Sequence, residues 1–115
     1  MGTFAFLLQG PNRTLLYLPD IDDWRAWPGA TTVLAGVDTA VVDACFYSLD
    51  ELNGRPPVAH PLILDTLAFF AGWPGELVLT HFNHTNPVLV KGSRAETAVT
   101  QAGARLAYQG MRLML

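Results

Sequence analysis

The chain has 115 residues, of which 50% are hydrophobic and 15% charged, so residues 1–115 are expected to form one packed domain and not a disordered chain. Its net charge is −3 and its seven Lys and Arg residues are scattered, which argues against direct binding of nucleic acid. With one cysteine, Cys45, and only short apolar runs, the sequence predicts a cytoplasmic protein without a disulfide, a signal peptide or a membrane span.

The first half of the chain is predicted to form a β-hairpin followed by a buried strand. Residues 3–9 (TFAFLLQ) and 14–18 (TLLYL) are short apolar runs, and the turn residues 10–13 (GPNR) separate them. The carboxylates of residues 20–23 suit a loop or the first turn of a helix. Residues 39–43 (TAVVD) predict a third strand, which ends in a carboxylate.

The second half alternates predicted helices and strands. The predicted elements are an irregular loop over 46–58, a helix from His60 to about Ala71 with Pro61 in its first position, a strand over 76–80, a helix from the capping box at Ser93 to about Ala102, and two short strands over 105–107 and 111–113. This order of elements predicts an α/β layered fold with one mostly β sheet and two main helices.

Polar residues of catalytic type follow three of the predicted strands. Asp20 follows residues 14–18, Asp43 ends the strand over 39–43, and His81 follows the strand over 76–80. Strands that end together in one sheet bring such residues close in space, and His60 at a helix start could face the same site. Aspartate and imidazole are ligand types that suit Zn²⁺, Mn²⁺ and iron. The alternative for each residue taken alone is a helix cap or a structural role.

The densest polar cluster is residues 81–87 (HFNHTNP). Asn83, Asn86 and His84 could support a metal or orient a substrate there. The alternative is a turn in which both asparagines bond to nearby backbone and Pro87 starts a helix. For Cys45, burial as a small apolar side chain is favoured over a role as a nucleophile.

Four segments, LYLPDIDDW, VVDACFYSLDEL, AHPLILDTL and THFNHTNPVL, in this order resemble the second half of metallo-β-lactamase-fold proteins. Within that superfamily they look like the relatives of pyrroloquinoline quinone biosynthesis protein B, from about residue 3 to residue 115. The resemblance implies half of an αββα sandwich and, for the complete fold, a metal-dependent hydrolase of a small-molecule substrate with zinc, manganese or iron.

The resemblance also implies a role for individual residues. Asp20 matches the aspartate that bridges two metals in this fold, and His81 matches the last histidine ligand. Asp43 and His60 resemble the acidic residue and the histidine that pair beside the metals in the ribonuclease Z branch, where the pair handles a proton at the leaving group. His84, Asn83 and Asn86 would then lie behind the metals or meet the substrate.

The superfamily's His-x-His-x-Asp-His motif belongs to the first half, and this sequence does not contain it. We therefore expect the chain alone to bind metal weakly or not at all and to be inactive. A half sandwich would also expose its inner sheet face, which would explain the high mean hydropathy of +0.26. The alternatives are a non-catalytic module that pairs through this face with itself or with a separate amino-terminal half, and a truncated product without function.

Overall fold

The computed structural model describes residues 5–19, 21, 23–52 and 60–115. In chain order its elements are β1 (Phe6–Gln9), β2 (Thr14–Leu18), η1 (Trp24–Ala26), α1 (Ala30–Leu34), β3 (Thr39–Asp43), η2 (Leu49–Leu52), α2 (Ile63–Phe70), β4 (Glu76–Thr80), η3 (Pro87–Leu89), α3 (Arg94–Gln101) and β5 (Arg105–Leu106). Among the described residues, none of the helices has the length and apolar character needed to cross a membrane.

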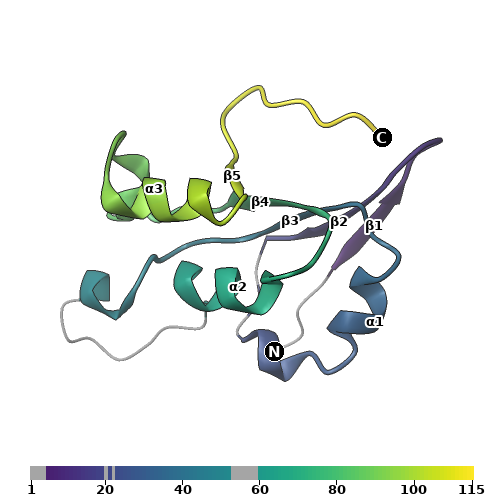
Figure 1. The fold of residues 1–115 in the computed structure, drawn as a ribbon, viewed down its shortest axis with the longest axis horizontal. Coiled ribbons are helices and arrows are strands. Elements are labelled where there is room, and N and C mark those ends of the chain that lie inside the picture. Colours follow the sequence, from purple (N-terminus) through teal and green to yellow (C-terminus); the bar gives the residue numbers. More distant parts are fainter. Residues whose placement is uncertain (1–4, 20, 22, 53–59) are drawn as a thin grey trace.

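The strands form one sheet in the order β1-β2-β3-β4-β5. Strands β1 and β2 pair antiparallel as a hairpin. The pairs β2–β3, β3–β4 and β4–β5 are parallel. Figure 1 shows α1 and α2 on one face of the sheet and the carboxy-terminal segment passing over the other. Because the parallel strands share a direction, the chain leaves β3 and β4 at the same edge of the sheet, where a site can form.

The two faces of the sheet are covered unequally. Alternate residues of β2, β3 and β4, among them Leu16, Val42 and Leu79, pack under the helices in the larger core. On the other face Leu15, Val41 and Val78 form a smaller cluster, against which partly buried apolar side chains of the segment 107–115 pack. Strand β1 is exposed along its whole length.

The mixed α/β fold, the hairpin and the strands β3 and β4 are confirmed. The Ser93 cap of the predicted capping box is confirmed, since its hydroxyl accepts from the backbone N–H of Glu96 at 3.1 Å and α3 follows. The Glu96 carboxylate accepts from the Gly92 N–H at 2.8 Å, one residue before the position that a capping box predicts. Two parts of the prediction lie outside the described residues. They are residues 3 and 4 of the predicted first strand and residues 53–59 of the predicted loop.

The structure differs from the prediction in one helix boundary, one strand and two elements that were not predicted. The second helix starts at Ile63 and not at Pro61, because Leu62 stays extended and pairs with Phe46 in a β-bridge. Residues 111–113 are not a strand; this segment crosses the smaller cluster instead, and the carbonyl of Leu115 accepts from the backbone of Asn12 at 2.8 Å. The short helix α1 and the turn η2 were not predicted.

Candidate metal centre

Strands β3 and β4 deliver two of the predicted site residues to one edge of the sheet. Asp43 is the last residue of β3 and pairs in register with Thr80, the last residue of β4. The pairing extends one residue further, because the Ala44 N–H donates to the Thr80 carbonyl at 2.7 Å. His81 therefore leaves the sheet directly beside the carboxylate of Asp43.

The chain beyond β3 brings His60 to the same place. Residues 44–47 continue away from the sheet, and within them Phe46 forms a parallel bridge with Leu62. The Phe46 carbonyl accepts from the Ile63 N–H at 2.9 Å, which fixes the start of α2 against this segment. Since His60 lies just before that start, the bridge holds its imidazole next to Asp43 across 17 positions of sequence.

The carboxylate of Asp43 is fully buried, and among the described residues it is contacted by backbone N–H groups and by an imidazole nitrogen. Its Oδ1 accepts from the Cys45 N–H at 2.9 Å, and its Oδ2 lies 2.5 Å from Nδ1 of His60 and 3.4 Å from the Ile21 N–H. Burial raises the pKa of Asp43, and the hydrogen bonds from His60 and Cys45 oppose that rise. Burial therefore disfavours the ionised form of Asp43, and the adjacent imidazole of His60 favours it.

His81 is turned toward Asp43 by an unusual backbone conformation. Its φ is 62°, in the left-handed region that side-chain-bearing residues seldom adopt, and such strain is often found at functional sites. Its Nδ1 lies 2.8 Å from the carbonyl of Pro19 and 3.9 Å from Oδ2 of Asp43. A carbonyl can only accept, so this bond places the proton on Nδ1 and leaves Nε2 of His81 as an acceptor.

The donor set fits a divalent metal such as zinc. Asp43, His60 and His81 each offer a ligand atom, and these atoms lie within 4.8 Å of one another. Ligands of a tetrahedral zinc lie about 3.4 Å apart, so modest side-chain adjustment would bring the three into range. A ligand histidine usually donates its other ring N–H to a carboxylate or a carbonyl, which is how His81 is held by Pro19.

The other predicted residues divide into three groups. Asp20, the predicted bridging ligand, lies outside the described residues. Asn86 is buried and structural: its amide donates to the carbonyls of Ala44 at 2.9 Å and Cys45 at 3.1 Å. His84 lies on an exposed turn outside the Asp43, His60 and His81 cluster, and Asn83 donates to the hydroxyl of Thr85 beside it.

Two contributors to the site were not predicted. The carbonyl of Pro19 holds His81, and the carboxylate of Glu51 accepts from the Tyr47 N–H at 2.7 Å and from the Thr85 hydroxyl at 2.7 Å. Every residue has a backbone carbonyl, so the sequence does not reveal which carbonyl binds a side chain. Glu51 lies in the segment predicted to be an irregular loop. In such a segment the sequence pattern does not predict the direction in which a side chain points.

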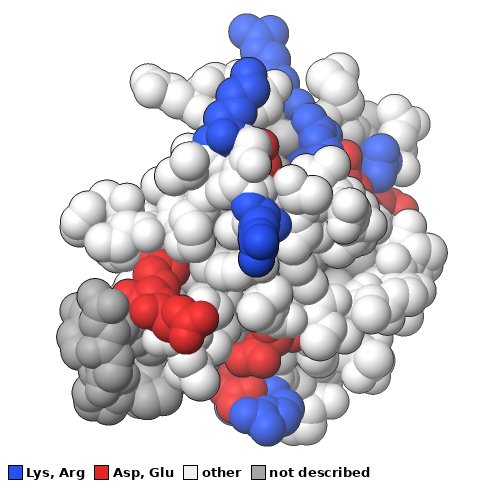
Figure 2. All heavy atoms as spheres, turned by 60° about the vertical axis from the view of Figure 1, so that its left-hand side comes forward, with Lys and Arg blue, Asp and Glu red and all other residues white. Residues whose placement is uncertain are grey.

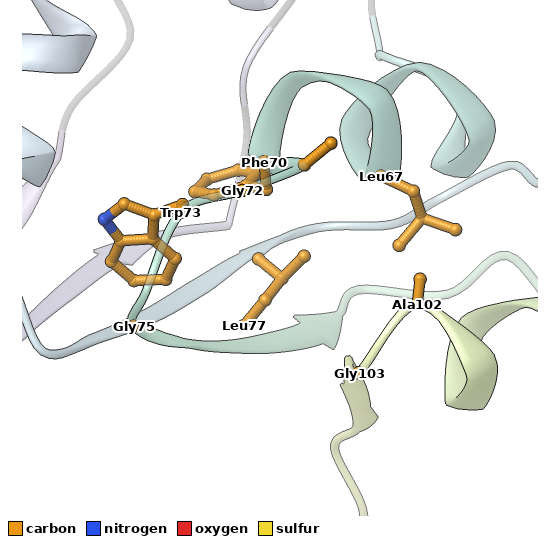
Figure 3. A pocket seen from close by; sticks show the side chains of 9 residues that line it. Leu67, Phe70, Gly72, Trp73, Gly75, Leu77, Ala102 and Gly103 are labelled. Carbon is orange, nitrogen blue, oxygen red and sulfur yellow. The ribbon is translucent and has the colours of Figure 1, made fainter.

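A separate cavity lies at the opposite end of β4. It has a volume of about 300 Å³ and is lined by apolar side chains and glycines, including Leu67, Phe70, Trp73 and Leu77. Figure 3 shows Trp73 and Gly75 before β4 begins, whereas His81 follows its end. The cavity is therefore not part of the Asp43, His60 and His81 cluster.

Comparison with known proteins identifies relatives over nearly the whole chain. No family model matches. Coenzyme PQQ synthesis protein B from Methylobacterium radiotolerans is 31% identical over 126 residues, which cover 98% of this chain and 41% of the relative. The protein of the same name from Klebsiella pneumoniae is 29% identical over 90% of this chain and 37% of its own length. The chain thus spans about two fifths of the length of the curated relatives it matches.

Solved structures confirm the fold. The crystal structure of zinc-bound PqqB from Methylobacterium extorquens superposes with a TM-score of 0.84 at 22% identity, over 96% of this chain and 43% of that one. A diphosphatase from the PhnP family gives a TM-score of 0.61 at 19% identity, over 98% of this chain and 43% of that chain. The resemblance noted in the sequence is confirmed: the chain is similar to coenzyme PQQ synthesis protein B over nearly its whole length, and it has the fold of the part that it shares with the PqqB structure.

Proposed function

We propose that this chain provides one half of the centre of a metal-dependent hydrolase of the metallo-β-lactamase type. The observation that carries the proposal is the convergence of Asp43, His60 and His81 at one sheet edge, with their ligand atoms within 4.8 Å. The names of the two structural neighbours, a zinc-bound PqqB and a diphosphatase, support both the metal and the hydrolytic chemistry. Zinc is the favoured metal, and a cytoplasmic location stays a prediction.

One of the three side chains would bind the metal, and the other two would take part in proton transfer. His81 would bind the metal through Nε2, because its Nδ1 is held by Pro19. Asp43 is fully buried and contacts Nδ1 of His60, so it would orient that imidazole and stabilise its charged form. His60 would then give a proton to the leaving group at its other ring nitrogen. A bound metal would supply Lewis-acid activation of the bond that is cleaved.

With the roles divided in this way, the described residues supply fewer ligands than a catalytic zinc site needs. Such sites have three protein ligands, and in this proposal Asp43 and His60 serve proton transfer while His81 binds the metal. Asp20 would add a second ligand. The remaining ligands would come from the part of the fold that the relatives carry beyond the 41% matched here. We therefore expect weak zinc binding by the chain alone and hydrolysis only when the other half is present.

Metal content of three histidine variants tests this division of roles. His81→Ala should lose zinc in a competition titration with a chromophoric chelator, whereas His60→Ala should keep it and, with the other half supplied, lower turnover. His84→Ala is the matched control and should leave zinc binding unchanged. Equal loss of zinc in His60→Ala and His81→Ala would make His60 a ligand and reject its role in proton transfer.

A second candidate function, a module that docks through its sheet face, is favoured by the exposed strand β1. Phe6 and Leu8 share a face with Tyr17 by strand register, and they are 55%, 50% and 39% exposed. The chain exposes 7319 Å², whereas a folded monomer of 12.5 kDa exposes about 6,200 Å². The difference, about 1,100 Å², is larger than one side of a standard protein interface, about 800 Å². Figure 2 shows another side of the molecule, where most of the surface is also uncharged.

Sedimentation at micromolar concentration tests the docking function. The wild-type chain should form dimers or larger species, and Leu8→Lys should shift it to a monomer because a charge cannot be buried unpaired in the contact. Leu89→Lys, at an equally exposed leucine in η3, is the control and should leave the distribution unchanged. A monodisperse wild-type monomer would rule out self-association and leave only a separate amino-terminal half as partner.

A further inference from the structure

Glu51 connects two segments of backbone that lie on either side of the metal centre. It belongs to η2, outside the sheet, and its Oε1 accepts from the Tyr47 N–H at 2.7 Å. Its Oε2 accepts from the hydroxyl of Thr85 at 2.7 Å, across 34 positions of sequence. One carboxylate therefore fixes the end of the 44–47 segment against the turn that follows His81.

On the β4 side, the contacts of Glu51 continue toward His81. The hydroxyl of Thr85, which donates to Glu51, accepts from the side-chain amide of Asn83 at 2.5 Å. The backbone N–H of Asn83 donates to the carbonyl of Cys45 at 2.8 Å, so this turn is also tied to the extension of β3. Asn83 lies two residues beyond His81, and a shift of the turn would move that imidazole.

On the other side, the contacts lead to His60. Tyr47, whose N–H is held by Glu51, accepts through its carbonyl from the Leu64 N–H at 3.4 Å. The preceding residue, Phe46, accepts from the Ile63 N–H at 2.9 Å. These two bonds set the first turn of α2, which begins directly after the segment that carries His60.

We propose that Glu51 is a positioning residue of the metal centre, which sets the separation of His60 and His81 without contacting either. The proposal rests on the metal-binding function proposed above. An ionised carboxylate suits the position because both of its oxygens face donors, and charged acceptors make stronger hydrogen bonds than neutral ones. Loss of a direct partner of a metal ligand typically weakens metal binding by about 10-fold to 100-fold, and Glu51, which acts through further hydrogen bonds, should have a smaller effect.

Three substitutions separate positioning from a general effect of charge. Glu51→Ala removes both contacts and should weaken zinc binding by up to about 10-fold with unchanged stoichiometry. Glu51→Gln can still accept from Tyr47 and donate to Thr85, so it should recover most of the affinity. Asp50→Asn removes the same charge one residue earlier and is the control, with affinity expected to match that of the wild type.

The Thr85→Val substitution breaks the same link from its other end. It should weaken zinc binding to an extent similar to Glu51→Ala, and the double variant should be no weaker than Glu51→Ala alone, because the two side chains act as one unit. Additive losses would show that Glu51 acts on the site by another route. Thr85→Val also serves if Glu51→Ala fails to fold.

A measurement without metal separates failure of this proposal from failure of the proposed function. Long-range ¹H–¹⁵N spectra should show shifted imidazole signals of His60 and His81 in Glu51→Ala, and wild-type signals in Asp50→Asn and Glu51→Gln. If the wild-type chain bound no zinc yet these shifts appeared, the metal function would fall and the positioning role would stand. Wild-type imidazole signals in Glu51→Ala would overturn the proposal, as would equal changes in Asp50→Asn.

Discussion

Asn86 is expected to be the most important single polar side chain for the stability of the site. It is 1% exposed and makes three hydrogen bonds to backbone: its amide donates to the carbonyls of Ala44 and Cys45, and its carbonyl accepts from Val88 at 3.1 Å. Asn86→Ala would remove all three bonds and leave the Ala44 carbonyl and the Val88 N–H without these partners, whereas the Cys45 carbonyl keeps the bond from the Asn83 N–H. At about 1 kcal/mol for each bond, the free energy of unfolding should fall by about 3 kcal/mol.

Urea unfolding and thermal melts measure this loss. For a chain of this length a loss of about 3 kcal/mol lowers Tm by about 12 °C. Asn83→Ala is the matched control, since its amide bonds only to the exposed hydroxyl of Thr85, and it should cost less than about 1 kcal/mol. Equal, small effects of the two substitutions would refute the reasoning, because the Ala44 carbonyl and the Val88 N–H would then have other partners available.

Three further predictions follow from buried polar groups and from a helix cap. Thr66→Val removes the acceptor of the Trp24 indole N–H, which lies 2.8 Å away, and should cost about 1–3 kcal/mol in urea unfolding. Ser93→Ala removes the cap of α3 and should cost about 1 kcal/mol in the same assay, with Thr97→Ala as an exposed control. Burial raises the pKa of Asp43, so its contribution to stability is full below its ordinary value of 3.8 and is lost as the pH rises through the raised folded value. In a His60→Gln background, Asp43→Asn should therefore cost more unfolding free energy at pH 4 than at pH 7, and a pH-independent cost would contradict the raised pKa.

The sequence predicted the elements whose pattern is local and uninterrupted. Strands β3 and β4 have the predicted bounds, because each is a run of apolar residues limited by polar or turn residues. Helix α1 was missed because Ala30–Leu34 is short and contains Thr and Val, which favour helices weakly; burial of Ala30 and Leu34 stabilises it instead. The start of α2 depended on a pairing with Phe46 that no local pattern reveals.

The candidate site was predictable in part, for the same reason. Asp43 and His81 follow apolar strands, so their proximity followed from the parallel order of β3 and β4. The position of His60 at a predicted helix start allowed it to face the same site, and the family resemblance implied its pairing with Asp43. The contact itself depends on the bridge between Phe46 and Leu62, which no local pattern reveals. Glu51 could not be predicted, because its hydrogen bonds depend on the backbone path of an irregular segment.

The long-range ¹H–¹⁵N spectrum of the three histidines, recorded before and after addition of saturating zinc, tests the proposed metal centre most directly. Without metal, the proton of neutral His81 should lie on Nδ1, because this nitrogen donates to Pro19. Zinc should then shift the Nε2 signal of His81 and leave both ring nitrogens of His84 unchanged. A His81 signal that does not respond to zinc, or a proton found on its Nε2, would contradict the proposed centre.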